Sequence, residues 1–318
     1  MKIEIPEISK QIYKEEILSI FEKKYSKFVP FWVNHQMEWM NGTYAAFKNH
    51  DKYLIIIFLI KKTLDFYSRN FTKISYDEFY LKEIIEIEKF TISEISIFLN
   101  IPKETTRRKV IELENEKIIQ KIKEKFIIDR SKFFYHKPEE SIKRTARFLS
   151  SLSELCVNEK IISKKITSDE LQKIIKNNFS YIWKMYYELQ IPMMVGYKKF
   201  FKDLESFHIY GTCAVSQYLD SKNNSADHYA DRIKYLDIFF SMSKTQGINA
   251  MSISEITGIP RATVIRKLQN LVRKKNILID AKKHYRIARD FSRMLLPLQK
   301  NVFIKLADFS AQVFNQKY

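Results

Sequence analysis

Arginine and glutamine side chains recur along the segment from Arg261 to Arg273 at helical spacing. Arg266, Gln269 and Arg273 follow one another at steps that keep them on one side of a helix. Arginine and glutamine can make paired hydrogen bonds to the edges of guanine and adenine in a DNA groove. This side of the segment is therefore a candidate surface for reading nucleic acid.

The sequence carries no comparable signal for covalent or metal chemistry. It has five glycines and six histidines, without a glycine-rich phosphate-binding motif, a Gly-x-Ser-x-Gly motif or a His pair at metal-ligand spacing. We expect Cys156 and Cys213 to be buried thiols without a chemical role. The sequence thus gives no case for an enzyme, a cofactor or a metal site.

The elements around this segment follow a recognisable order. Asn249 can cap a short helix that ends at Gly258 in a left-handed turn, and Pro260 can begin the next helix. An apolar strand at 277–279, a polar tip and a return strand at 285–288 come next. Helix, tight turn, helix and two-stranded ribbon is the layout of a winged helix-turn-helix.

The run Gly258 to Leu271, G-I-P-R-A-T-V-x-R-x-L-x-x-L, resembles the recognition-helix region of IclR- and MarR-type transcriptional regulators. The resemblance covers about forty residues, and it implies that the second helix lies in a DNA major groove. The opposite face of this helix is predicted to be buried, through Val264, Leu268, Leu271 and Val272.

An internal repeat places a second copy of this pattern earlier in the chain. Phe90 to Ile119 aligns without gaps to Ile248 to Ile277, and Thr91 with Glu94 forms a predicted capping box. A helix at 102–117, with Val110 and Leu113 inward, and a wing at 118–129 follow. We therefore expect two winged helix-turn-helix units, each with a two-stranded wing.

Charge separates the two units. The chain has a net charge of +18, which an AT-rich genome can inflate through lysine, so arginine is the better indicator. Six of 13 arginines lie between Arg261 and Arg293. Residues 241–290 hold 11 basic and three acidic residues, and residues 91–130 hold nine and seven. The second unit is predicted to dominate contact with double-stranded DNA.

The predicted DNA contacts differ in role. Arg266 is expected to meet base edges, whereas Lys282 and Lys283 in the wing are expected to meet phosphates. The full set in the second unit is Arg261, Thr263, Arg266, Lys267, Gln269, Asn270, Arg273, Lys282, Lys283 and Arg286. The set in the first unit is Lys103, Thr105, Arg107 and Arg108, close to the repelling carboxylate of Glu104.

The remaining sequence predicts helices. One is expected at 7–28, ended by Pro30, and a buried one at 52–68, with a strand at 54–60 as the alternative. Further expected features are a turn at Asn41–Gly42, local breaks at Pro138 and Pro192, surface connections at 160–168 and 221–226, and helices at 139–157 and 290–314.

Aromatic side chains gather in the segments before the two units. They are expected to fill the core, and lining a pocket for a small-molecule effector is the alternative. These residues are Trp32, Trp39, Tyr44, Phe47, Tyr181, Trp183, Tyr186 and Tyr187. Because a Trp-bearing segment precedes each unit and a helix follows it, the whole chain is predicted to be duplicated.

The fold is accordingly predicted to be mainly α, with two winged helix-turn-helix units embedded in flanking helices. The segments are an N-terminal helical segment at 1–73, the first unit at 74–137, a central helical segment at 138–228, the second unit at 229–290 and a C-terminal helix at 291–318. The longest apolar run, Tyr53 to Ile60, is too short to span a membrane, and the N-terminus lacks a signal-peptide core. We expect a cytoplasmic protein, either a monomeric pseudo-dimer or a homodimer.

These features favour a sequence-specific transcriptional regulator that uses tandem winged helix-turn-helix units. Two alternatives remain open. One is a plasmid-type replication initiator, which also carries two winged domains. The other is a structural or assembly protein that uses winged helices for protein contacts.

Overall fold

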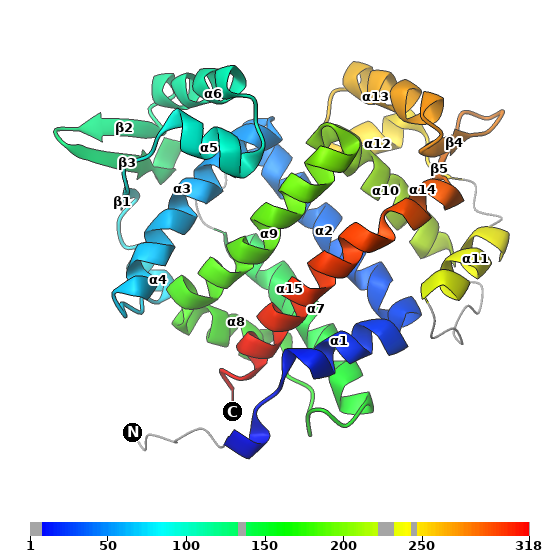
Figure 1. Cartoon of the computed structure of the whole chain (residues 1–318), viewed down its shortest axis with the longest axis horizontal. Helices are drawn as coiled ribbons and strands as arrows, with labels where there is room; N and C mark the ends of the chain where they lie inside the picture. Colours follow the sequence, from blue (N-terminus) through cyan, green and yellow to red (C-terminus); the bar gives the residue numbers. More distant parts are fainter. Residues whose placement is uncertain (1–7, 133–137, 222–231, 243–246, 318) are drawn as a thin grey trace.

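The computed structural model describes residues 8–132, 138–221, 232–242 and 247–317. This part of the chain is mainly helical, with one three-stranded and one two-stranded antiparallel sheet. Figure 1 shows long helices in the middle of the molecule and the two sheets on opposite flanks. No helix of the described ranges is long and apolar enough to cross a lipid bilayer.

The N-terminal part holds η1 (Ile8–Lys10), α1 (Lys14–Lys23), α2 (Tyr25–Phe47) and α3 (His50–Arg69). The helix predicted at 7–28 is wrong in both bounds. The helix α1 begins only at Lys14 and ends before Lys24, and the next helix, α2, continues through Pro30. The predicted turn at Asn41–Gly42 is also wrong, since both residues lie inside α2.

Burial explains why Pro30 does not end α2. Proline removes one backbone hydrogen bond from a helix interior, which alone disfavours the helix. Phe28, Val29 and Trp32 flank the proline and are buried in the core, which requires the helical path. Pro192 lies inside the helix α9 (Phe179–Phe201) in the same way, so the predicted break there is wrong, whereas Pro138 does precede the helix α7 (Glu139–Asn158).

The buried helix predicted at 52–68 is confirmed by α3, and the alternative strand at 54–60 is wrong. Asn49 begins α3 by accepting a hydrogen bond from the backbone N–H of Lys52 at 3.0 Å. Every residue from Leu54 to Ile60 is buried, which accounts for the lack of a polar side in this stretch.

The central part continues from α7 with α8 (Ser168–Asn177), α9, α10 (Leu204–Ser221) and α11 (Arg232–Met242). The expected connection at 160–168 lies between α7 and α8, and the one at 221–226 falls almost wholly outside the described residues. The C-terminal helix predicted at 290–314 is divided into α14 (Arg289–Met294) and α15 (Leu296–Phe314). Pro297 explains the division, because it suits the first turn of a new helix better than a helix interior.

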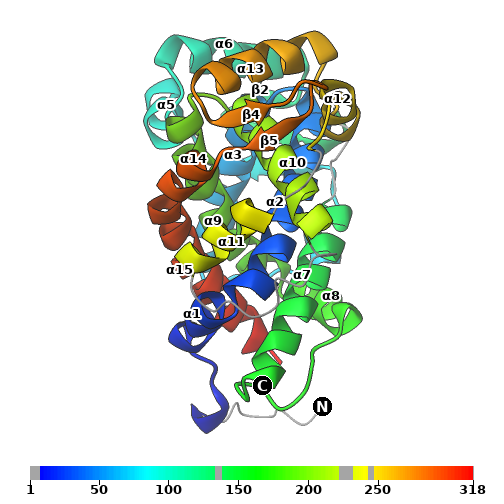
Figure 2. The ribbon, with the colours of Figure 1, turned by 90° about the vertical axis from the view of Figure 1, so that its right-hand side faces the viewer.

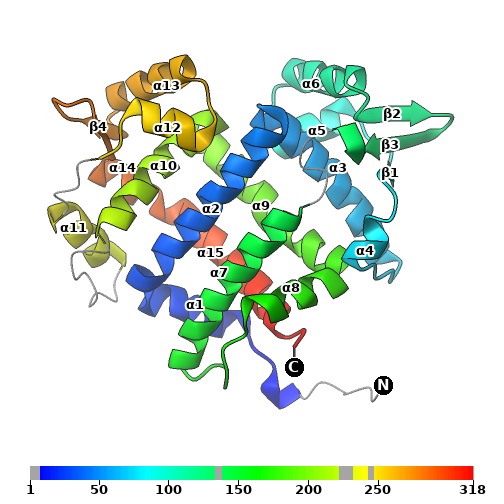
Figure 3. The same cartoon turned by 180° about the vertical axis from the view of Figure 1, so that it is seen from behind.

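The long helices pack in reciprocal pairs around one continuous core. The helix α3 lies against α9 as α10 lies against α2, and α1 lies against α15 as α8 lies against α7. Trp39, Trp183 and Tyr186 are fully buried among these helices. Figure 3 shows α2 and α7 from behind, with α9 and α15 farther away. The early and late parts of the chain are thus interlocked.

Two similar groups of elements follow α3 and α10. The first unit consists of α5 (Ile92–Leu99), α6 (Lys103–Asn115), β2 (Ile119–Ile122) and β3 (Lys125–Asp129). The second unit consists of α12 (Ala250–Thr257), α13 (Arg261–Arg273), β4 (Ile277–Ile279) and β5 (Tyr285–Ile287). These bounds confirm the individual helices and strands expected in both segments.

The first sheet departs from the expected two strands. After α4 (Tyr76–Phe79), the strand β1 (Ile84–Ile87) pairs with β3, so the strand order is β1-β3-β2, and η2 (Arg130–Lys132) follows. No local pattern in the sequence predicts β1, because its partner lies some forty residues away along the chain. In the second sheet, a single bridge between Ile248 and Tyr285 occupies the corresponding edge within the described ranges.

Candidate nucleic-acid interface

Short polar contacts define both the start of α12 and the turn between α12 and α13. The side chain of Asn249 accepts hydrogen bonds from the backbone N–H groups of Met251 and Ser252, at 2.9 and 3.0 Å. Gly258 takes the left-handed conformation with φ of 69°, which glycine adopts without steric cost. Ser254 donates its hydroxyl to the carbonyl of Ile259 at 2.7 Å, which fixes the start of α13.

The helix α13 has a buried face and a charged face. Val264, Leu268 and Leu271 are buried, as the sequence predicted, and Val272 is half-buried. The exposed side carries Arg261, Arg266, Gln269 and Arg273. None of these three arginines forms an ion pair with another described residue. Their guanidinium groups are therefore available to an incoming anion.

Lys267 is turned toward the body of the molecule. Its Nζ atom lies 2.7 Å from Oδ1 of Asp203, and only 14% of the lysine side chain is exposed. Burial raises the pKa of Asp203, but hydrogen bonds from Lys267 and the Ser206 backbone outweigh this, so the net pKa is lowered. This pair ties α13 to the start of α10. Thr263 and Asn270 are half-buried beside the exposed face.

Asp280 organises the tip of the β4–β5 hairpin. Its Oδ1 atom accepts backbone hydrogen bonds from Lys282 and His284, both at 2.9 Å. These backbone hydrogen bonds, that of His284 first, lower the pKa of the Asp280 carboxyl. Lys282 and Lys283 are left exposed on the tip, and Arg286 is half-buried on β5. The Asp280 carboxylate thus stays charged, with its Oδ1 atom held by the backbone.

Carboxylates occupy the charged face of α6. Glu104 holds Arg107 through two contacts, Oε2 to Nε at 3.0 Å and Oε1 to Nη2 at 2.5 Å. This hydrogen bonding lowers the pKa of Glu104. Arg108 lies 3.9 Å from Glu112. Lys103 is exposed and Thr105 is half-buried, so only part of this predicted set is free to meet a phosphate.

The helices α6 and α13 lie at the same end of the molecule. Figure 1 and Figure 3 show both along one edge, with the two hairpins directed outward on opposite sides. In Figure 2, turned by 90°, α6 and α13 again lie together at that end. A single extended partner can therefore reach both helices.

The aromatic residues considered for an effector pocket are divided by the structure. Trp183 and Tyr186 are buried in the core, Tyr44 is buried near the end of α2, and Phe47 is half-buried. Trp32 lines one internal cavity, Trp39 and Tyr187 line another, and Tyr181 lines a third hollow. Trp32, Trp39 and Tyr187 are themselves buried in the core, so the core interpretation is confirmed for them as well, and an effector pocket stays a prediction.

Sequence reasoning missed Asp203, which anchors α13. The sequence does contain a signal for this position: Lys202–Asp203 follows α9 as Lys48–Asn49 follows α2. In each pair the lysine has a left-handed backbone conformation, and the next residue caps the following helix with its side chain. Aligning the helices before the two units would have identified this position.

No protein-family model matches this chain, and neither a curated protein nor a solved structure matches it. The case for function therefore depends on the geometry of the two units.

Proposed function

We propose that this protein is a sequence-specific DNA-binding transcriptional regulator built from two winged helix-turn-helix units, with the second unit dominating DNA contact. The observation that carries the proposal is the exposed face of α13. It presents Arg261, Arg266, Gln269 and Arg273 without a neutralising carboxylate among the described residues. A winged unit normally lays this helix in the major groove and its wing on the flanking backbone.

The wing supports the same mode of binding. Lys282 and Lys283 lie at the exposed tip, and Asp280, the nearest carboxylate along the chain, is occupied by backbone N–H groups. Lysines in such a position would bind phosphates without regard to sequence. The arginines of α13 would supply the sequence preference.

We infer that the chain is a duplication folded as a pseudo-dimer. The helices α1 and α8 have 10 residues each, and α2 and α9 have 23 each. Gly42 and Gly196 take the same position in α2 and α9 and face Arg144 of α7 and Leu298 of α15, respectively. The reciprocal packing of α3 on α9 and α10 on α2 supports the same symmetry.

The pseudo-dimer has a consequence for the DNA site. Two recognition helices at one end of the molecule would face neighbouring half-sites on one duplex, as in dimeric helix-turn-helix proteins. Because α6 and α13 carry different side chains, the half-sites would be unequal. MarR-type regulators build a similar arrangement from two chains with one winged unit each, so this resemblance is one of layout.

Exposed apolar side chains favour protein contact as a second role, and they occur on both units: on α12, Met251 is 57% exposed and Ile256 is 50% exposed. Ile97 is 82% exposed and Phe98 is 47% exposed on α5, and the arginine nearest the start of α6 is held by Glu104. An assembly role for this unit, or a replication-initiator role for the whole chain, would use the same elements on different partners.

Genome-wide mapping of bound DNA tests the proposal. The native chain and Arg266→Ala would be compared in the organism that encodes it. Enrichment at promoters that is lost in Arg266→Ala supports the regulator, and enrichment at iterated origin repeats supports the initiator. Absence of enrichment for the native chain would refute DNA binding and leave the assembly role.

A further inference from the structure

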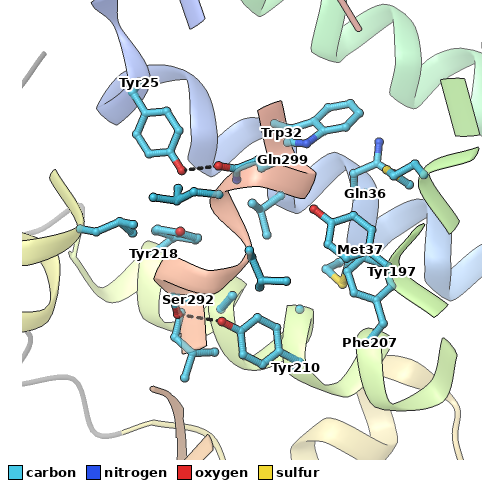
Figure 4. Close-up of a pocket in the computed structure, with 18 residues that line it drawn as sticks. Tyr25, Trp32, Gln36, Met37, Tyr197, Phe207, Tyr210, Tyr218, Ser292 and Gln299 are labelled. Carbon is cyan, nitrogen blue, oxygen red and sulfur yellow. Dashed lines mark hydrogen bonds between the residues drawn. The ribbon is translucent and has the colours of Figure 1, made fainter. Parts of the chain in front are cut away.

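An internal cavity of about 70 Å³ lies beside the second unit (Figure 4). Its walls come from α2, α9, α10, α11, β5 and the start of the C-terminal helices. Figure 4 shows Gln36, Met37, Tyr197 and Phe207 on one side, and Tyr25 and Tyr218 facing them. The volume exceeds what one water molecule requires. None of the residues described as lining it carries a charge, so its contents would be neutral.

Gln36 on the wall of this cavity has an unsatisfied amide. The residue is 3% exposed, and neither its Nε2 nor its Oε1 atom has a hydrogen-bond partner among the described residues. Two other pairs of polar groups on the wall are satisfied: Tyr25 donates to Gln299 at 2.8 Å, and Tyr210 shares a hydrogen bond with Ser292 at 2.7 Å. A buried amide without a partner costs stability, so its presence calls for a partner that the chain does not supply.

The other half of the molecule holds a related but different cavity of about 50 Å³. Counted from the starts of α3 and α10, Ile57 and Ile60 line that cavity where Gly211 and Ala214 line this one. Glu140 and Arg144 also line the smaller cavity. Small residues and a neutral wall therefore distinguish the cavity beside the second unit.

Gly211 has a second effect on this cavity. A Cβ atom at this position would lie 2.2 Å from Sδ of Met37, so glycine leaves room for the Met37 side chain between α2 and α10. Gln36, the neighbour of Met37, lies on the cavity wall.

We propose that this cavity binds a small uncharged molecule with an amide-like donor and acceptor, which pairs with the side-chain amide of Gln36. A cyclic amide meets these requirements, because its N–H and C=O groups lie side by side and complement the two free atoms of Gln36.

A ligand bound in this cavity should also stabilise the β4–β5 hairpin. Ile287 of β5 lines the cavity, and its backbone N–H donates to Oε1 of Gln217 on α10 at 2.6 Å. A ligand that packs against Ile287 would hold β5 against α10. The amide of Ile287 would then exchange more slowly with solvent.

The test uses 2-pyrrolidinone as the probe and cyclopentanone, which lacks the N–H group, as its matched control. Both would be titrated into the full chain by ligand-observed NMR and followed by hydrogen exchange. We expect 2-pyrrolidinone to bind and to slow exchange at β5, with cyclopentanone roughly tenfold weaker. Equal binding of the two compounds, or protection only at sites remote from β5, would overturn the proposal.

Two variants locate the interaction. Gln36→Met should keep its fold, melt at or above the native temperature, and lose binding of 2-pyrrolidinone. Gln190→Met is the control, because Gln190 takes the same position in α9 and is also fully buried, with neither amide atom paired among the described residues, but it does not line this cavity. Gln190→Met should bind like the native chain. If Gln36→Met binds equally well, or unfolds where Gln190→Met does not, the amide has a structural role and the site assignment is wrong. Neither readout involves DNA, so the result is independent of the proposed function.

Discussion

The first and second units have matching elements, but the exposed face of α6 carries paired carboxylates and arginines whereas that of α13 carries arginines without an ion pair among the described residues. At equivalent positions along α6 and α13, Glu104 and Arg107 of the first unit stand where Ala262 and Ile265 stand in the second. Arg107 of the first unit is neutralised by Glu104, one helical turn before it. The difference teaches that the inward residues maintain the element layout while the outward residues set what the surface can bind.

The two units are also anchored by ion pairs of opposite polarity. In the first, Lys52 of α3 reaches Glu112 of α6 at 3.0 Å and Glu116, the residue after α6, at 2.6 Å. In the second, Lys267 of α13 reaches Asp203 before α10 at 2.7 Å. The first arrangement places carboxylates on α6 and directly after it. In the second arrangement the carboxylate lies outside α13, on Asp203. Anchoring and surface charge are thus linked in each unit.

The largest effect expected concerns what the units share. Leu113→Ala and Leu271→Ala remove fully buried side chains at equivalent positions, so each should lower the free energy of unfolding by roughly 2–5 kcal/mol. Urea denaturation of each variant against the native chain measures this loss. A loss below about 1 kcal/mol in one unit would show that the two cores are not equivalent.

Lowering the pH should reduce the free energy of unfolding, because two buried histidines, His50 of α3 and His208 of α10, meet in the core. Burial lowers the pKa of His50 to about 3 and that of His208 well below its usual range, and the two rings lie 5.3 Å apart. Histidine titrates near 6.5 when unfolded, so between about pH 6.5 and 3 only the unfolded state gains these protons. Stability should fall with pH in this window by about 1.4 kcal/mol per pH unit for each histidine.

Denaturation at pH 7 and pH 5.5 checks this expectation. His50→Gln should show a shallower loss of stability than the native chain. An identical pH dependence in the variant would mean that His50 takes up a proton without unfolding.

The wing should act through charge alone. Lys282→Ala should weaken binding to specific and scrambled duplexes alike and reduce the slope of log affinity against log salt by about one. Lys121→Ala, in the first wing, should change the slope less, because Lys121 lies 3.8 Å from Glu124. Titrations at several salt concentrations measure both slopes. A sequence-dependent loss in Lys282→Ala would assign base contact to the wing.

The smallest effect expected is a gain in affinity for DNA. Glu104→Ala should release Arg107 and tighten DNA binding roughly twofold, because an exposed ion pair in water is weak to begin with. Glu104→Gln is the control that keeps the size of the side chain. If both variants bind DNA less tightly, Glu104 contributes to recognition and the first unit reads DNA in its own right.

Local signals explain what the sequence could predict. The caps at Thr91 and Asn249 and the left-handed Gly258 act over a few residues, so the helices of both units were predicted closely. Long-range contacts explain what it could not predict. The strand β1 depends on β3, and the inward turn of Lys267 depends on Asp203, far away in the chain. Proline is disfavoured locally in α2 and α9, and burial of the surrounding side chains decides the outcome.

The candidate surface was predicted from residue type and spacing alone. Arg261, Arg266, Gln269 and Arg273 are all exposed because the apolar residues between them fix which way the helix faces. The cavity at Gln36 could not be predicted, since it requires α2, α10 and β5 to meet. Pattern therefore indicates a surface more readily than an interior site.

Fluorescence-anisotropy titration of Arg266→Ala and Arg108→Ala tests the central claim, that the second unit reads the DNA. The two arginines take equivalent positions in α13 and α6, and both variants would be titrated with the mapped site and a scrambled duplex. We predict that Arg266→Ala loses roughly 1–3 kcal/mol of binding free energy on the mapped site and discriminates less at one base position. Arg108→Ala should lose less. Full affinity in Arg266→Ala together with loss of the site in Arg108→Ala would contradict the claim and assign recognition to the first unit.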